Sequence, residues 1–205
     1  MTDSDGNGGG GGLDLEAERG QRRPDKRQRL VQGARLVLHQ QGVEKTTIAD
    51  VAQAADVPAG NVYYYFKTKD ELVRAAIDAQ AQDIKTKLAS FDRHRSPKAR
   101  LKAFVRSITD QREAAALYGC PHGTLCSELG KRHDDLERAP AILMQLFIDW
   151  AEQQFRSMGR RDARDLAVAM IASYQGIMLL TNTFREPELL SREARRLDRW
   201  IDSLA

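Results

Sequence analysis

The sequence predicts an all-α protein of about nine helices, in which three short N-terminal helices form a compact head followed by a larger helical unit. Two observations lead to this fold class. Alanine, leucine, arginine, glutamate and glutamine are frequent while aromatic residues make up only 6% of the chain, a composition that favours helices. Beyond residue 24, apolar residues recur at the spacing of amphipathic helices, and no convincing strand pattern or internal repeat interrupts them.

The first 20 residues form an acidic, glycine-rich tail that includes the run Gly8–Gly12. Such a segment has high backbone entropy and almost nothing apolar to bury, so we expect disorder there. The tail is also the reverse of a secretory signal, which has a basic start and an apolar middle. No segment approaches the roughly 20 uninterrupted apolar residues of a membrane span. The sequence therefore predicts a cytoplasmic protein with no membrane partner.

Cysteine content and charge add two further constraints. Cys120 and Cys126 are too few and too close together for a disulfide framework, which agrees with a reducing compartment. The net charge is only +3, but basic residues crowd the segment 22–69, where acidic residues are few. This modest basic region suits phosphate groups, although it is not unique to them.

The first helix of the head is expected to begin near Pro24 and to stop at Gly42, because glycine is typical of the position just beyond a helix end. Its apolar residues recur on one face. They are Leu30, Ala34, Val37 and Leu38.

Two shorter helices complete the head. Thr47 is a predicted N-cap, with Asp50 placed to reach back toward it, and this helix should run to about Ala55. Residues 56–57 form a tight turn. A third helix follows over residues 58–66, beginning at a proline whose fixed φ suits a first turn.

Six further helices are expected in residues 69–205, which we treat as a second domain after the head at 21–68. Thr68 and Glu71 predict a capping box for a long helix that ends before His94. The next helix begins at residues 96–97, and a bend is expected at 119–123. The remaining helices are expected around 125–129, 143–150, 162–183 and 188–204.

Two short helices joined by a tight turn, preceded by a supporting helix, form the arrangement in which the last helix can enter the DNA major groove. A small internal core is available to hold them together. It comprises Ile48, Val51, Ala52, Val57, Val62 and Phe66. The same spacing leaves five residues on the surface of the third helix. These are Ala59, Gly60, Asn61, Tyr63 and Tyr64.

The stretch 42–72, GVEKTTIADVAQAADVPAGNVYYYFKTKDEL, resembles the signature of the TetR family of bacterial repressors. With the first helix included, the resemblance covers about fifty residues, and the remaining all-helical pattern is similar to the family's effector-binding and dimerisation domain. Two positions depart from the family pattern. Asp56 stands where the turn usually has glycine, and Pro58 stands where a serine or threonine cap is common. Aspartate tolerates the left-handed conformation at some cost, whereas Pro58 puts a phosphate contact in doubt.

The resemblance implies a homodimeric transcriptional regulator that binds palindromic double-stranded operator DNA and is released by a small-molecule effector of unknown identity. It implies neither an enzyme nor a cofactor. Carried over by position, Thr47 and Tyr64 hold phosphates, with Lys69 adding a charged contact. Gly60 lets the backbone approach DNA, and Asn61 is the candidate for reading adenine.

The remaining predicted DNA contacts are weaker. The basic arm that includes Arg23 and Lys26 reaches neighbouring phosphates in this interpretation, but these side chains could equally belong to a solvated helix end. Tyr63 could pack under the head rather than face DNA, and Tyr64 could be a simple exposed aromatic.

The last two predicted helices resemble the pair that forms a four-helix dimer interface in this family. The candidate contacts are Tyr174, Met178, Leu197, Trp200 and Ile201, some of which could instead face the protomer core. An effector cavity between the other helices would be lined mainly by apolar and aromatic groups. Its candidates are Phe104, Ile108, Tyr118, Cys120, Met144, Phe147, Trp150, Met170 and Tyr174, and more of them are expected in the core than in the cavity.

The segment 118–129, YGCPHGTLCSEL, resembles a Gly-Cys motif of one branch of the family, some of whose members sense electrophiles through that cysteine. Cys120 is such a sensor if a helix N-terminus or His122 raises its thiolate fraction. Alternatively, Cys120 and Cys126 are buried small hydrophobic residues, which we favour because free cysteine is among the most buried residue types.

Three other interpretations stay open at this stage. Cys120, His122, Cys126 and His133 include zinc-binding groups, but their spacing matches no familiar finger or ribbon, and we expect no metal. A thiol enzyme with Cys120 and His122 as nucleophile and base is disfavoured, because residues two apart on a helix point to different sides. An architectural DNA-binding protein would show weak sequence preference and no effector response.

Overall fold

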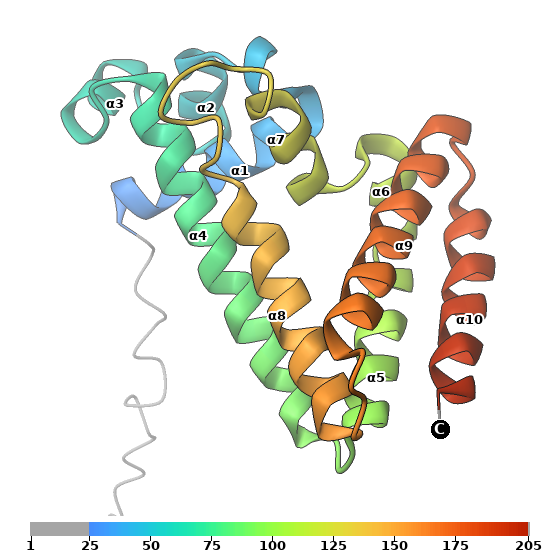
Figure 1. Cartoon of the computed structure of the whole chain (residues 1–205). Coiled ribbons are helices and arrows are strands. Elements are labelled where there is room, and N and C mark those ends of the chain that lie inside the picture. The colour runs from blue at the N-terminus through green and yellow to red at the C-terminus, as the bar shows by residue number, and fades with distance from the viewer. Residues whose placement is uncertain (1–24, 205) are drawn as a thin grey trace, which may run out of the picture.

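The computed structural model describes residues 25–204, which form ten α-helices and one 3-10 helix without a strand (Figure 1). The predicted all-α class is confirmed. The expected disordered tail and Arg23 of the basic arm lie outside the described residues. One short helix, α6 (Arg112–Tyr118), was not among the nine expected ones.

Helix α1 (Lys26–Lys45) begins at Asp25, whose carboxylate accepts a hydrogen bond from the Gln28 amide at 2.7 Å. The predicted stop at Gly42 is a break in the helix. Gly42 has φ +82° and is followed by a last turn to Lys45. The Glu128 carboxylate lies against this break and accepts the Val43 amide hydrogen bond at 2.5 Å. A side chain at Gly42 would therefore strain the backbone and clash with the Glu128 carboxylate.

Helices α2 (Ile48–Ala54) and α3 (Ala59–Tyr65) follow with the predicted local chemistry. The Thr47 and Asp50 capping box is confirmed, with reciprocal amide contacts of 3.2 and 2.9 Å. The Asp50 carboxylate accepts hydrogen bonds from the Thr47 amide, the Thr47 hydroxyl and the Gln41 side chain, and these lower the pKa of Asp50. Asp56 adopts the left-handed conformation with φ +51°, and its carbonyl accepts a hydrogen bond from the Arg29 guanidinium at 3.0 Å.

The long helix α4 (Lys69–Ser90) leaves the head and leads into the body. Thr68 caps it as predicted, accepting the Glu71 amide at 3.1 Å, but the Glu71 carboxylate accepts the amide of Lys67 instead of that of Thr68. A 3-10 turn (Phe91–Arg93) ends this helix before His94, as expected.

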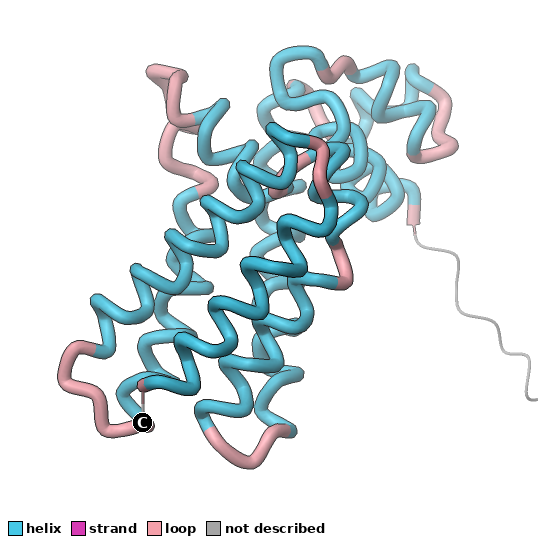
Figure 2. Tube along the Cα trace, turned by 90° about the vertical axis from the view of Figure 1, so that its right-hand side faces the viewer, coloured by secondary structure: helices cyan, strands magenta, loops and turns pink. Residues whose placement is uncertain are grey.

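The body is completed by six helices that lie beside α4 and pack on it and on one another (Figure 1, Figure 2). They are α5 (Pro97–Thr109), α6, α7 (Pro121–Leu129), α8 (Ala141–Ser157), α9 (Ala163–Phe184) and α10 (Pro187–Ser203). Helix α8 packs against α4 and α9, while α10 covers the outer side of α5 and α9. Their shared core includes the fully buried side chains of Leu101, Leu143, Phe155 and Met170.

Helix α9 is long and apolar enough to cross a membrane by length and composition alone. A core helix of a helical bundle passes the same test, and one face of α9 is buried at Ala167, Met170 and Ile171. Its other face exposes apolar side chains, including those of Leu179 and Phe184.

Candidate nucleic-acid interface and ligand cavity

Helix α3 presents an exposed face whose side chains are held by a buried opposite face. Val62 and Phe66 are buried in the head, whereas Tyr63 and Tyr64 are 55% and 78% exposed. The alternative in which Tyr63 packs under the head is therefore wrong. Ala59 and Gly60 are also exposed, Asn61 is partly exposed, and a Cβ at Gly60 would meet nothing within 4 Å. All five predicted surface residues thus lie on one open helix.

Close packing of α1 on α2 fixes the position of α3. Gly33 in α1 is buried, and a Cβ there would lie 3.0 Å from both the Val51 carbonyl oxygen and the Ala55 amide nitrogen. This contact was not identified from the sequence, because Gly33 is an isolated glycine inside a helical pattern. Arg27 adds a second link, with its guanidinium 5.1 Å from the centre of the Phe66 ring.

Two of the three residues predicted to hold phosphates, Thr47 and Lys69, already have polar partners within the chain. The Thr47 hydroxyl donates to the Asp50 carboxylate at 2.8 Å, and the Lys69 ammonium donates to the Glu44 carbonyl oxygen at 3.2 Å. Both residues lie at helix starts, where free backbone amides also favour anions. Lys26 is exposed at the start of α1. Lys67, which was not predicted, is exposed just after α3 and donates to the Tyr63 carbonyl oxygen at 2.9 Å.

A cavity of about 220 Å³ lies in the body between α1, α4, α5, α7, α8 and α9. Its inner wall is apolar and aromatic, with Ile84, Phe104, Ile108, Phe147 and Tyr174 all buried. Exposed residues at its edge are polar or charged. These are Asp83, Lys87 and Gln111.

Four of the predicted lining residues reach this cavity, namely Phe104, Ile108, Phe147 and Tyr174. The other five do not line it. Tyr118 is exposed and contacts His39, Met170 is fully buried in the core, and Met144 packs on the core from its edge. Trp150 packs against Phe91 and Phe104 behind the wall, and Cys120 reaches the cavity only through Tyr174. Amphipathic spacing identifies apolar residues, but it does not distinguish those that line the cavity from those that pack behind its wall.

The sequence interpretation missed the polar lining of the cavity. It is formed by Arg35, Gln80, Asp83, Lys87, Ser107, Gln111 and His122, together with Pro121. Most of these residues belong to helix faces that read as solvated in the sequence, and they come from segments far apart in the chain. Only their three-dimensional arrangement reveals the site.

His122 is neutral at physiological pH. Burial of its ring is the largest cause that lowers its pKa to about 4, and the charges of His39, Arg35 and Lys87 lower it further. Its Nδ1 lies 3.1 Å from the Gln80 side-chain oxygen, which can only accept, so Nδ1 donates. Tyr174 is also kept neutral, because burial raises the pKa of its hydroxyl.

Cys120 is the N-cap of α7 and is only 6% exposed. Its Sγ accepts a hydrogen bond from the Gly123 amide at 3.3 Å and lies 3.7 Å from the Tyr174 hydroxyl. Burial and the nearby Cys120 raise the pKa of Cys126 to about 11, so that thiol stays protonated. Within residues 25–204, no three His, Cys, Asp or Glu side chains are grouped as a metal site requires.

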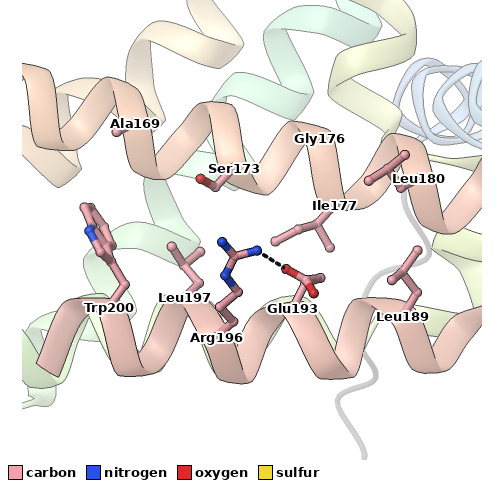
Figure 3. Close-up of a pocket in the computed structure, with 10 residues that line it drawn as sticks. All are labelled: Ala169, Ser173, Gly176, Ile177, Leu180, Leu189, Glu193, Arg196, Leu197 and Trp200. Atoms are coloured by element: carbon pink, nitrogen blue, oxygen red, sulfur yellow. Dashed lines mark hydrogen bonds and ion pairs between the residues drawn. The ribbon is translucent and has the colours of Figure 1, made fainter. Parts of the chain in front are cut away.

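The predicted dimer contacts are mostly turned inward. Met178 and Ile201 are 2% and 0% exposed, and Tyr174 lines the cavity, so these three cannot present a surface to a partner. The reason is that their stripe packs on other helices of the same protomer. Leu197 and Trp200 lie instead along a groove of about 590 Å³ between α9 and α10 (Figure 3).

This groove is bordered by small residues on α9 and by longer side chains on α10. Ala169, Ser173 and Gly176 follow one line of α9, opposite Glu193 and Arg196 of α10 (Figure 3). Neighbouring apolar residues of α9 are exposed. They are Val168, Leu179, Leu180 and Phe184.

Comparisons with known proteins agree with this geometry. Residues 30–76 match the family described as "Bacterial regulatory proteins, tetR family". An uncharacterised HTH-type transcriptional regulator in the lacX 3′ region of Lactococcus lactis subsp. lactis is 29% identical over 173 residues, covering 80% of this chain and 87% of the relative. The HTH-type transcriptional repressor DhaR of Mycobacterium sp. (strain GP1) is 26% identical over 178 residues, covering 81% and 87%.

Solved structures show the same fold. A TetR transcriptional regulator from Legionella pneumophila has a TM-score of 0.78 at 18% identity and covers 87% of this chain and 98% of that one. The regulatory protein TetR from Rhodobacter sphaeroides has a TM-score of 0.74 at 25% identity, with coverages of 84% and 96%. These relatives are transcriptional regulators and not enzymes, which removes the thiol-enzyme interpretation. With its helix-turn-helix head, which the family model matches, and with its helical body and these relatives, the chain is similar to the TetR family of bacterial transcriptional regulators.

Proposed function

We propose that the protein is a cytoplasmic, ligand-responsive repressor whose homodimer binds a palindromic operator and releases it when a small molecule fills the cavity in the body. The observation that carries this proposal is that residues from two helices connecting head and body line the cavity. Arg35 belongs to α1, the supporting helix of the head, and Asp83 and Lys87 belong to α4, which begins directly after α3. A ligand in the cavity therefore contacts both helices that connect head and body.

DNA binding is assigned to the exposed face of α3. Asn61 and the two exposed tyrosines would enter the major groove, while Thr47, Lys69 and Lys26 would contact phosphates. The domain boundary at Thr68 follows from this division, since Thr68 caps the helix that enters the body.

A second copy of the chain would cover the exposed α9 and α10 face. Small residues along α9 allow two helices to approach closely, and the surrounding exposed leucines and Phe184 provide apolar area. Two heads in a symmetric dimer read half-sites about 34–36 Å apart. Replacing Leu180 with Glu should shift the protein to monomer in analytical ultracentrifugation, with exposed Leu36→Glu as the matched control.

The mechanism is a change in separation between the two recognition helices. The ligand shifts the equilibrium only if it binds the released arrangement better than the operator-bound one. A tenfold loss of operator affinity requires about 1.4 kcal/mol of coupling. Small-angle scattering that gives the same head separation with and without an inducer would contradict this mechanism.

The proposal is tested by a gel shift with the DNA flanking the protein's own gene, at several salt concentrations. Specific retardation that falls steeply with salt and weakens in Tyr64→Ala is expected. Tyr118→Ala is the matched control, because Tyr118 is also exposed but lies in the body. If neither this DNA nor a random-site selection yields a retarded sequence, the repressor function is wrong.

A sensor function for Cys120 is the second candidate, and one contact favours it. The Gly123 amide at the start of α7 donates a hydrogen bond to Sγ, and reactive cysteines are often found at helix N-termini. Release of operator DNA by an alkylating electrophile, and loss of that release in Cys120→Ser, would support the sensor. Cys126→Ser is the control: it should release operator DNA as readily as the wild type, since that thiol stays protonated.

A further inference from the structure

We propose that the ligand of the body cavity is a small monocyclic aromatic acid, with its ring among Phe104, Phe147 and Tyr174 and its carboxylate beside Lys87. This inference rests on the proposed function, because it names the chemical class of the effector.

The volume of the cavity sets the size of the ligand. A cavity of about 150 Å³ is sufficient for benzene, and this cavity measures about 220 Å³. One ring with a small substituent therefore fits, whereas a multi-ring compound requires the walls to move.

The inner wall suits a flat apolar ring. Phe104, Phe147 and Tyr174 form a closed set of three neighbours, with centroid separations of 5.8 Å, 6.1 Å and 5.8 Å. The neutral His122 ring extends this wall, with its centroid 5.5 Å from that of Phe147. Edge-to-face and tilted contacts at these separations are the favoured geometry between aromatic rings.

The mouth of the cavity carries an unpaired positive charge. Asp83 is neutralised by Arg35 at 2.6 Å, which leaves Lys87 as the cation without an ion pair within 4 Å among the described residues. Desolvation lowers the pKa of Lys87, and the more distant Asp110 only partly opposes this. An anion at the mouth would compensate the partly desolvated ammonium.

Ligands of other charge fit less well. A cationic ligand would meet the ammonium of Lys87, because Arg35 and Asp83 already neutralise each other, and a neutral ligand would leave that ammonium uncompensated. The cavity has an aromatic inner wall and a cationic mouth. It therefore favours a molecule with an apolar ring at one end and a carboxylate at the other.

The test is isothermal titration calorimetry on the full chain without DNA, using benzoate, neutral benzamide and cationic benzylamine at pH 7.5. Benzoate should bind about fivefold more tightly than benzamide, as expected for one partly exposed ion pair, and benzylamine should bind most weakly. Lys87→Met should remove the preference for benzoate over benzamide. Lys85→Met is the matched control, because Lys85 is exposed two positions away on α4 and does not line the cavity.

Equal binding of benzoate and benzamide, tighter binding of benzylamine, or binding of none of the three would overturn the inference. Phe147→Leu provides a second variant that keeps the wall apolar, and it should weaken both benzoate and benzamide. Because calorimetry needs no DNA, a failure here differs from a failure of the proposed function. Benzoate that binds without releasing operator DNA would contradict the ligand-responsive repressor and leave the ligand class standing.

Discussion

The candidate functional residues of the head lie on its surface, whereas those of the body lie inside it, at the edge of the core. In the head, a small core turns Tyr63 and Tyr64 outward, so the surface intended for DNA adds little to stability. In the body, Phe147 and Tyr174 serve both the core and the cavity wall. Recognition and stability are thus separable in the head but coupled in the body, and the following experiments test that difference.

The largest effect is expected at the cavity wall. Phe147→Ala should lower the free energy of unfolding by about 3–5 kcal/mol, because it enlarges an existing void in the core. Urea denaturation at fixed protein concentration measures this cost. The contrasting variant Tyr64→Ala should stay within about 0.5 kcal/mol of wild type. A comparable loss in both variants would remove the distinction between the two regions.

Two glycines sharpen the comparison within the head itself. Gly33→Ala should destabilise the protein by about 1–3 kcal/mol, because its Cβ would press on the backbone of α2. Gly60→Ala has open space and should be neutral or stabilising by up to about 1 kcal/mol through helix propensity. Thermal unfolding of the two variants is the measurement. Operator affinity should fall in Gly60→Ala if the α3 backbone approaches DNA there.

The partly buried His122 gives the body a pH dependence just below neutral pH. Its folded pKa of about 4 lies below the ordinary value of 6.5, so the unfolded chain binds more protons between these values. Its contribution is complete above pH 6.5 and is lost as pH falls toward 4. We expect wild type to lose about 2 kcal/mol from this group between pH 7.5 and 5.

His122→Gln supplies the control for this pH effect, since a glutamine does not titrate. Urea midpoints of the two proteins should converge as the pH falls from 7.5 to 5. Parallel pH profiles would mean that the imidazole is not desolvated in the folded protein.

The smallest effect is expected from the exposed Lys26. Lys26→Ala should weaken operator binding several-fold for all sequences alike and should reduce the salt slope by about one, as for a single phosphate contact. Gel shifts at four salt concentrations measure the slope. Unchanged unfolding of this variant is expected, and an unchanged slope would assign Lys26 to a solvated helix end.

The sequence predicted the head better than the body for a physical reason. Thr47 with Asp50, the break at Gly42 and the left-handed Asp56 are local signals, determined by residues a few positions apart. The polar cavity lining joins Arg35, Lys87 and His122 across almost ninety positions, and nothing local marks them as neighbours. Helical spacing identified apolar faces correctly, but it could not tell whether Met178 faces its own protomer or another.

Helix α1 belongs to the head and to the cavity at once, which has a mechanical consequence. Lys26 lies nine positions before Arg35, or about 13 Å along the helix axis. The Glu128 carboxylate holds the far end of the same helix at the Gly42 break. If that contact acts as a pivot, α1 is a lever with a short inner arm at the cavity and a longer outer arm at the DNA. A tilt too small to disturb the packing around Arg35 is then amplified at the end where Lys26 is proposed to contact phosphates.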